Sequence, residues 1–257
     1  MNQSERRNYL IQKLLEEQPK YAKMQIPKKS EEQKTLLRAL MNVRMPGELS
    51  EEFLKIQDTY LAEENAAKGV VTPVDMEELS PEIYLWKGDI TRLQVGAIVN
   101  AANSCMTGCY QPCHNCIDNC IHTYAGIELR NYCNDIMQRQ GYAEPTGQAK
   151  ITPAFNLPCD YVIHTVGPIV QGRLTEEHER LLCSCYEACL RIAEEKNVES
   201  IAFCCISTGV FMFPNERAAE LAIQTVKQYK DRTKSKIKVI FNVFKEEDEQ
   251  IYRRFLG

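Results

Sequence analysis

The sequence predicts an α/β domain that follows a small helical region. Residues 82–257 alternate short apolar runs with longer amphipathic segments, which is typical of a sheet covered by helices. Residues 1–70 contain only helix-type patterns, and Pro73 and Pro81 indicate a linker after them. We therefore divide the chain into a helical region (1–70), a linker (71–81) and an α/β domain (82–257).

Three helices are expected in the helical region. Residues 4–18 place tyrosine and leucine side chains at helical spacing. Ser30 is a suitable N-cap, followed by two glutamates, for a helix that runs to about Val43. Pro46 ends that helix, and Ser50 is the expected N-cap of the third.

The α/β domain contains six strand patterns and four helix patterns. Strands are expected at 83–86, 95–100, 148–155, 161–166, 200–206 and 237–244. Helices are expected at 117–140, 176–196, 215–229 and 246–255. The helix at 176–196 carries leucine and cysteine side chains on one stripe, which indicates a face that packs against the core.

Composition and charge restrict the function classes. The net charge of −4 offers no broad attraction to nucleic acid, so no nucleic-acid partner is expected. No window reaches the roughly 18 consecutive apolar residues of a membrane span, and the charged N-terminus lacks the apolar centre of a secretion signal. We therefore expect a cytoplasmic protein without a membrane partner.

Residues 100–126 concentrate metal-binding side chains. Five of the 12 cysteines and two of the four histidines lie there, directly after an apolar strand. In a reducing compartment, clustered cysteines more often bind metal or act in catalysis than form disulfides. Thiolates and imidazoles in one loop favour zinc. Asn103, Asp118 and His122 add polar groups beside that metal, which indicates an active site.

Four segments together resemble one family. They are GDIT at 88–91, NAAN at 100–103, IDNCIH at 117–122 and ISTGVFMFP at 206–214. In this order, over residues 82–257, they resemble the macrodomains, which bind ADP-ribose. The resemblance implies a three-layer α/β fold, with a mixed central sheet and helices on both faces, after the helical region.

The resemblance also implies how ADP-ribose is held. Asp89 would bind the adenine amino group, although an aspartate here can equally stabilise its own turn. The glycine-containing loop 207–211 offers backbone N–H groups to the diphosphate, and its Phe211 would border the distal ribose. Phe244 could stack near adenine or belong to the core. The expected ADP-ribose contacts are Asp89, Ile90, Asn103, Cys116, Ile117, Asp118, Ser207, Thr208, Gly209, Val210 and Phe211.

The segment before Asp118 departs from the most common pattern. MacroD-type hydrolases carry glycines there, whereas this chain has CYQPCHNC at 109–116. This is similar to the zinc-dependent macrodomains of microbial pathogens, whose C-x4-H-x-C motif fits Cys109, His114 and Cys116 and one Zn²⁺ per chain. Three protein ligands leave one position open, as in catalytic zinc sites. The alternatives are Cys113, Cys120 or His122 as a ligand, and a four-thiolate site that uses Cys105, Cys109, Cys113 and Cys116.

The implied function is hydrolysis of the bond between mono-ADP-ribose and a modified, acidic side chain of a protein. Asn103 and Asp118 are the expected catalytic residues, Asn103 to fix the ribose and Asp118 to orient or activate water. Zinc itself could instead activate the water. The family association with a sirtuin-type ADP-ribosyltransferase suggests a modified carrier protein, of the lipoyl-carrier type, as substrate. The alternatives are a module that binds ADP-ribose without cleaving it, and a deacetylase of O-acetyl-ADP-ribose.

Two further hypotheses concern the surroundings of this site. The N-terminal helices could pack against the α/β domain as structure, or they could recognise the modified protein. Because thiolate ligands can be oxidised, loss of zinc under oxidising conditions is also expected.

Overall fold

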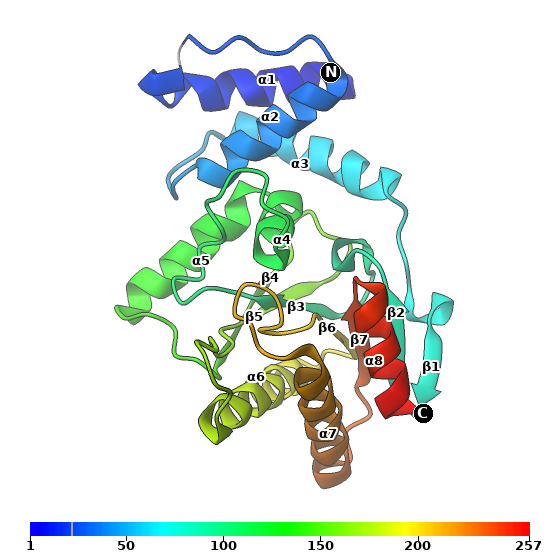
Figure 1. Cartoon of the computed structure of the whole chain (residues 1–257). Coiled ribbons are helices and arrows are strands. Elements are labelled where there is room, and N and C mark those ends of the chain that lie inside the picture. The colour runs from blue at the N-terminus through cyan, green and yellow to red at the C-terminus, as the bar shows by residue number, and fades with distance from the viewer. Residues whose placement is uncertain (22) are drawn as a thin grey trace.

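The N-terminal helices form a layer of their own in the computed structural model, which describes residues 1–21 and 23–257. They are α1 (Gln3–Glu16), α2 (Ser30–Val43) and α3 (Glu51–Ala67), and they lie together above the rest of the chain (Figure 1). Ser50 caps α3, as predicted, because its side chain accepts a hydrogen bond from the Phe53 N–H group. Ser30 is the first residue of α2 rather than its cap; Lys29 holds the cap position without a side-chain bond.

The α/β domain is built on one seven-stranded mixed sheet in the order β1-β2-β7-β6-β3-β5-β4. The five central strands are parallel, and β1 and β4 are antiparallel at the two edges. The strands are β1 (Glu77–Ser80), β2 (Ile83–Lys87), β3 (Ala97–Ala101), β4 (Ala149–Pro153), β5 (Tyr161–Thr165), β6 (Ser200–Phe203) and β7 (Lys238–Val243). The six expected strands are confirmed. The sequence missed β1, which lies inside the expected linker together with the short helix η2 (Pro73–Asp75).

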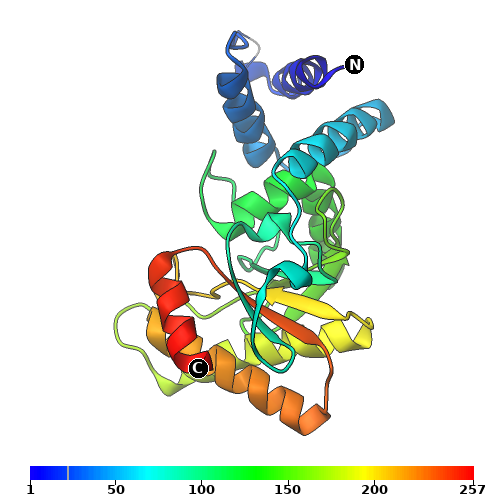
Figure 2. The same ribbon diagram turned by 90° about the vertical axis from the view of Figure 1, so that its right-hand side faces the viewer.

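Helices cover both faces of the sheet. The upper layer in Figure 1 holds α4 (Ile117–Ala125) and α5 (Ile127–Gln140). The other side carries α6 (Glu176–Glu195) and α7 (Asn215–Thr233), and α8 (Glu246–Leu256) packs on α7 and on β2. Figure 2 shows the N-terminal helices stacked beyond the α4–α5 layer. The predicted mixed sheet, with helices on both faces and a helical region before it, is therefore confirmed.

One predicted helix is wrong as a single element. The segment 117–140 is divided at Gly126, which ends α4 and begins α5. Gly126 has a φ of 102°, a backbone conformation that residues with a side chain rarely adopt. A β-carbon there would also lie 2.8 Å from Gln57 Nε2. The break starts a new helix whose first residue contacts α3, because the Ile127 N–H group donates to Gln57 Oε1 at 2.9 Å.

Gly126 provides a test of this break. We expect Gly126→Ala to lower the free energy of unfolding by about 1–3 kcal/mol, because the change combines backbone strain with a collision against Gln57. Gly141→Ala is the matched control, since Gly141 also has a positive φ, of 77°, but has no atom within 4 Å of the added carbon. Denaturant unfolding of both variants gives the comparison. Equal losses would show that the contact with Gln57 contributes nothing.

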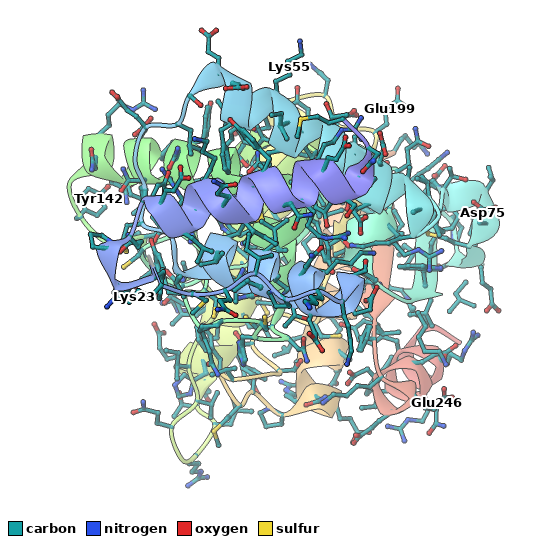
Figure 3. The ribbon with its side chains drawn as sticks, turned by 90° about the horizontal axis from the view of Figure 1, so that it is seen from above. Lys23, Lys55, Asp75, Tyr142, Glu199 and Glu246 are labelled. Carbon is teal, nitrogen blue, oxygen red and sulfur yellow. The ribbon has the colours of Figure 1, made fainter. Side chains whose placement is uncertain are left out.

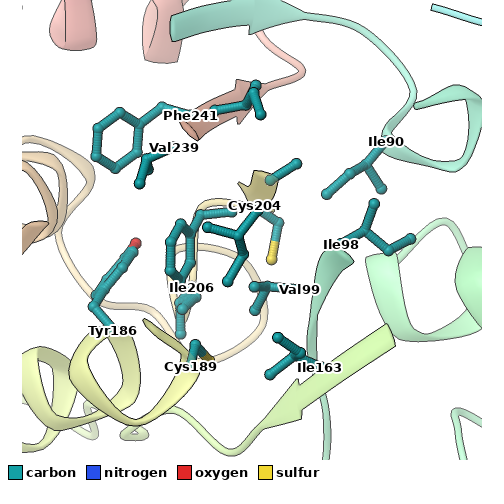
Figure 4. Close-up of a cluster of buried hydrophobic side chains, with 14 of the residues drawn as sticks. Ile90, Ile98, Val99, Ile163, Tyr186, Cys189, Cys204, Ile206, Val239 and Phe241 are labelled. Carbon is teal, nitrogen blue, oxygen red and sulfur yellow. The ribbon is translucent and has the colours of Figure 1, made fainter. Parts of the chain in front are cut away.

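Two hydrophobic cores result. The larger one lies between the sheet and its helices and includes Ile98, Val99, Tyr186 and Phe241 (Figure 4). The buried Cys189 and Cys204 belong to it and pack as small apolar side chains. The second core is formed by the N-terminal helices and includes Ile127 of α5. Charged side chains such as Lys55 and Glu246 project outward (Figure 3). Within residues 1–21 and 23–257, no helix is long and apolar enough to cross a membrane.

A pair of carboxyl groups lies where α3 meets α5. Burial, and then the neighbouring Asp58 carboxylate, raise the pKa of Glu128 to about 7. The folded chain therefore holds a proton on Glu128 between about pH 4.5 and pH 7 that the unfolded chain releases, so stability falls as the pH rises through this window. Glu128 is only half-buried, and solvent screening reduces the effect to about 1 kcal/mol.

We expect Glu128→Gln to remove this pH dependence and to raise the unfolding free energy at pH 8 by about 0.5–1 kcal/mol. Urea unfolding at pH 5 and pH 8 measures the free energy of unfolding of each variant. Glu48→Gln, which changes an exposed loop residue, is the control. A Glu128→Gln variant that follows the wild-type pH profile would contradict the assignment.

Candidate active site

A cavity of about 1730 Å³ opens at the carboxyl ends of the parallel strands. Ligands bind at this edge in open α/β sheets, because the loops that follow neighbouring strands meet there. The loops after β2, β3, β6 and β7 all contribute to its wall, and so do Ile117 and Asp118 at the start of α4. Every residue that the sequence predicts to contact ADP-ribose lies in the wall of this one cavity. Their individual contacts with a ligand remain predictions.

Three possible metal ligands meet on this wall. The ligand atoms of Cys109, His114 and Cys116 lie within 4.8 Å of one another. Cys109 Sγ is 3.6 Å from His114 Nδ1. Tetrahedral zinc, with its usual bonds to sulfur and nitrogen, would separate these two atoms by about 3.6 Å. Cys109 and His114 therefore have the separation that a shared zinc ion would give, and the three residues together could hold a metal ion.

The chemistry of the donors also fits a cation. Burial, and then the neighbouring Cys109 thiol, raise the pKa of Cys116, although its Sγ also accepts a hydrogen bond from the Asn119 N–H group as the N-cap of α4. Repulsion between two thiolates at this spacing disfavours ionising both unless a positive charge lies between them. A divalent metal supplies that charge, so this donor set favours Zn²⁺.

The other candidate ligands lie elsewhere. The thiol of Cys113 points at α2, where it donates to the Thr35 carbonyl oxygen at 3.5 Å. Cys105 is exposed, and Cys120 lies next to Arg38. His122 belongs to a separate buried group with Cys133 and His164. The four-thiolate site is not assembled in the described part of the chain, where the Cys109 triad and the His122 group are the two clusters within metal-binding distance.

Asp118 is a buried residue of the cavity wall and is held by two asparagines. Its Oδ1 accepts a hydrogen bond from Asn100 Nδ2 at 2.8 Å, and its Oδ2 accepts one from Asn103 Nδ2 at 3.2 Å. The side chain is only 5% exposed, and burial raises its pKa to about 6. A carboxylate with a raised pKa is a better proton acceptor at neutral pH than an exposed one. The sequence predicted Asn103 and Asp118 but missed Asn100.

Two neutral histidines lie beside this carboxylate and Asn100. His122 Nε2 is 3.5 Å from Asp118 Oδ1, and His164 Nδ1 is 3.1 Å from Asn100 Nδ2. Burial lowers the pKa of His164 to about 3 and lowers that of His122 well below its usual value. His122 is therefore a packed, neutral side chain and lies outside the Cys109 triad.

Asp89 stabilises its own turn and also lines the cavity, and its contact with adenine stays a prediction. Its Oδ1 accepts hydrogen bonds from the Thr91 N–H group at 3.0 Å and the Thr91 hydroxyl at 2.7 Å, which caps the short helix η3 (Ile90–Arg92). The side chain is nevertheless part of the cavity wall and remains partly exposed. Phe244 is 77% exposed on the same wall, so its alternative as a core residue is wrong.

The loop after β6 is shaped for close approach to a ligand. Ser207 has a φ of 66°, and the Phe213 N–H group donates to its carbonyl oxygen at 3.0 Å, which closes the loop on itself. Gly209 has open space where a β-carbon would lie, and Val210 is 71% exposed beside it. Successive N–H groups in such a turn can bind a diphosphate.

Comparison with known proteins supports this geometry. A model of the Macro domain matches residues 99–222. A protein-ADP-ribose hydrolase from Treponema medium is 56% identical over the full length of both chains. The chain belongs to the macrodomain family. A protein-ADP-ribose hydrolase from Staphylococcus aureus strain MRSA252 is 44% identical over 96% of this macrodomain and 94% of that protein.

Solved macrodomains have the same fold. The Oceanobacillus iheyensis macrodomain with ADP superposes with a TM-score of 0.62 at 34% identity. The match covers 70% of this macrodomain and 93% of the O. iheyensis chain. The Trypanosoma brucei macrodomain in complex with ADP-ribose gives a TM-score of 0.67 at 26% identity. That match covers 86% of this macrodomain and 95% of the T. brucei chain. The T. medium relative also aligns with the N-terminal helices of this macrodomain, which lie outside the family model. The family and the fold expected from the four motifs are thus confirmed.

Proposed function

We propose that this macrodomain is a zinc-dependent protein-ADP-ribose hydrolase that removes mono-ADP-ribose from acidic side chains. The observation that carries the proposal is the placement of Asp118, which is buried in the cavity wall two residues after the last member of a triad that could bind metal. Relatives that match nearly the whole chain are named protein-ADP-ribose hydrolases, which supports the same reaction here.

ADP-ribose would lie across the cavity. Asp89 and Ile90 bind the adenine, and the N–H groups of Ser207, Thr208, Gly209, Val210 and Phe211 bind the diphosphate. The distal ribose then reaches Asn103, Cys116, Ile117 and Asp118, beside the triad. The succession of loops along the edge of the sheet supports this order, in which the anomeric carbon would lie at Asp118.

The reaction adds water across the ester between the anomeric carbon and a side-chain carboxyl group. Asp118 accepts a proton from the water, whose oxygen bonds to the anomeric carbon. The bond between that carbon and the ester oxygen breaks, and the protein side chain leaves as its carboxylate. Asn100 and Asn103 hold the Asp118 carboxylate in one orientation, and Asn103 also fixes the ribose. When bound by Cys109, His114 and Cys116, zinc supplies Lewis-acid polarisation and a template for the ribose hydroxyls.

The partner of this macrodomain is proposed on the resemblance alone. We take the substrate to be a mono-ADP-ribosylated protein of the lipoyl-carrier type, modified by a sirtuin-type ADP-ribosyltransferase, in the cytoplasm. Binding of ADP-ribose without cleavage and deacetylation of O-acetyl-ADP-ribose are the competing activities, because both would use the same cavity.

The deciding experiment measures release of free ADP-ribose from a protein that carries mono-ADP-ribose on glutamate or aspartate. Native protein, protein stripped of metal with a chelator, and stripped protein with zinc restored are compared. We expect release to disappear on stripping and to return with zinc. Tight ADP-ribose binding without release would favour a binding module instead, and turnover of O-acetyl-ADP-ribose alone would favour the deacetylase.

A further inference from the structure

The metal-binding loop, residues 107–116, is held from outside the α/β domain by helix α2. Arg38 Nη2 donates to the His114 carbonyl oxygen at 2.7 Å. Asn42 Oδ1 accepts a hydrogen bond from the Cys113 N–H group at 2.9 Å. The Cys113 thiol donates to the Thr35 carbonyl oxygen at 3.5 Å. Three residues of α2 thus bind two consecutive residues of the loop.

The backbone of the loop explains why these two residues need support. Cys113 has a φ of 54°, in the left-handed region that costs a residue with a side chain about 1–2 kcal/mol. It lies directly before His114, so its conformation sets the direction in which that ligand leaves the chain. Asn42 binds the amide group of Cys113, and Arg38 binds the carbonyl group of the next residue. The strained residue is thereby fixed on both sides.

A second connection joins α2 to the beginning of the loop. Arg130 of α5, only 4% exposed, donates from Nε to the Thr107 carbonyl oxygen at 2.7 Å. Its Nη1 lies 2.6–3.0 Å from the carbonyl oxygens of Met41, Asn42 and Arg44 at the end of α2. A buried cation that depends on three carbonyl oxygens of α2 keeps its hydrogen bonds only while α2 is docked.

We propose that α2 is part of the metal centre, and that Arg38 and Asn42 are positioning residues that hold His114 ready for the metal. The N-terminal helices would then determine how tightly zinc is bound, in addition to covering the domain. This inference rests on the zinc site of the proposed function. It assigns a role to the helical region, which lies outside the family model and contributes Met45 and Pro46 to the cavity wall.

The test compares zinc affinity in full-length variants by competition with a chromogenic chelator. Arg38→Ala and Asn42→Ala are each expected to weaken zinc binding by about 10- to 100-fold, the range seen when groups that orient a ligand are removed. Arg38→Lys, which keeps a donor, should lose less. Adding Cys113→Gly to Asn42→Ala should restore part of the affinity, because glycine adopts the left-handed conformation without strain.

Asn65→Ala is the matched control. Asn65 of α3 donates to the carbonyl oxygens of Tyr124 and Asn156, at 3.1 and 2.7 Å, and so joins the helical region to the α/β domain away from the loop. We expect its zinc affinity to stay within about 2-fold of wild type. Thermal unfolding of the metal-free proteins and the spectrum of the cobalt-substituted forms show whether each variant is folded and whether its coordination geometry has changed.

The outcomes separate this inference from the proposed function. Wild-type affinity in Arg38→Ala and Asn42→Ala would overturn the inference and leave the zinc hydrolase intact. Equal losses in Asn65→Ala and Arg38→Ala would also overturn it, because general loosening of the helices would then be the cause. If the wild-type protein binds no zinc, the zinc dependence in the proposed function is wrong. The inference about α2 is then wrong as well.

Discussion

Replacing Asp118 by alanine is expected to lower the rate of ADP-ribose release by about 10²–10⁴-fold, the usual contribution of a positioned general base. The loss should fall on kcat more than on KM. The residues expected to bind adenine and diphosphate, at 89–90 and 207–211, lie in other loops and are unaffected. Zinc content should stay at one ion per chain, because Asp118 is outside the triad.

The stability of the Asp118→Ala variant needs separate measurement. The change leaves the amide groups of Asn100 and Asn103 without the carboxylate that they bind, and a buried donor without a partner costs about 1–3 kcal/mol. Asp118→Asn keeps the size of the side chain and is the better folded comparison. Turnover equal to wild type in both variants, with zinc retained, would remove Asp118 from the reaction and leave zinc to activate the water.

The sheet was predictable because its central strands are buried on both faces. Such strands are continuous apolar runs, as at Ile98 and Val99, and all of them were found. Strand β1 was missed for the opposite reason. Its residues Glu77–Ser80 lie at the sheet edge, none of them is fully buried, and a proline lies close on each side. The break at Gly126 was missed because apolar periodicity continues through it.

The site residues could be predicted only where they belong to short motifs beside the end of a strand or the start of a helix. The loops that contain Asp89, Asn103, Asp118 and Ser207 each follow a strand or begin a helix, so their meeting at one edge follows from the parallel sheet. The groups that support Asp118 depend on strand register instead. Asn100 on β3 lies opposite His164 on β5. The alignment of these two strands cannot be predicted from the spacing of residues along the chain. The contacts of Arg38 with the metal-binding loop depend on tertiary packing in the same way.

Replacing His114 by alanine is expected to abolish stoichiometric zinc binding and to reduce ADP-ribose release by more than about 10²-fold, because the Lewis acid is lost along with its ligand. Affinity for free ADP-ribose should change by no more than a few-fold, since most of the cavity wall is unaltered. Metal analysis, calorimetric titration with ADP-ribose and the release assay together measure these three quantities.

Cys105→Ser is the matched control for the His114 variant, and it also separates the two metal sites considered from the sequence. Cys105 lies in the same segment but is exposed and outside the triad. A site made of Cys109, His114 and Cys116 loses its zinc in His114→Ala and keeps it in Cys105→Ser. A four-thiolate site would give the reverse. Retained zinc with lost turnover in His114→Ala would mean that this imidazole acts on the substrate, and the triad would have to be reassigned.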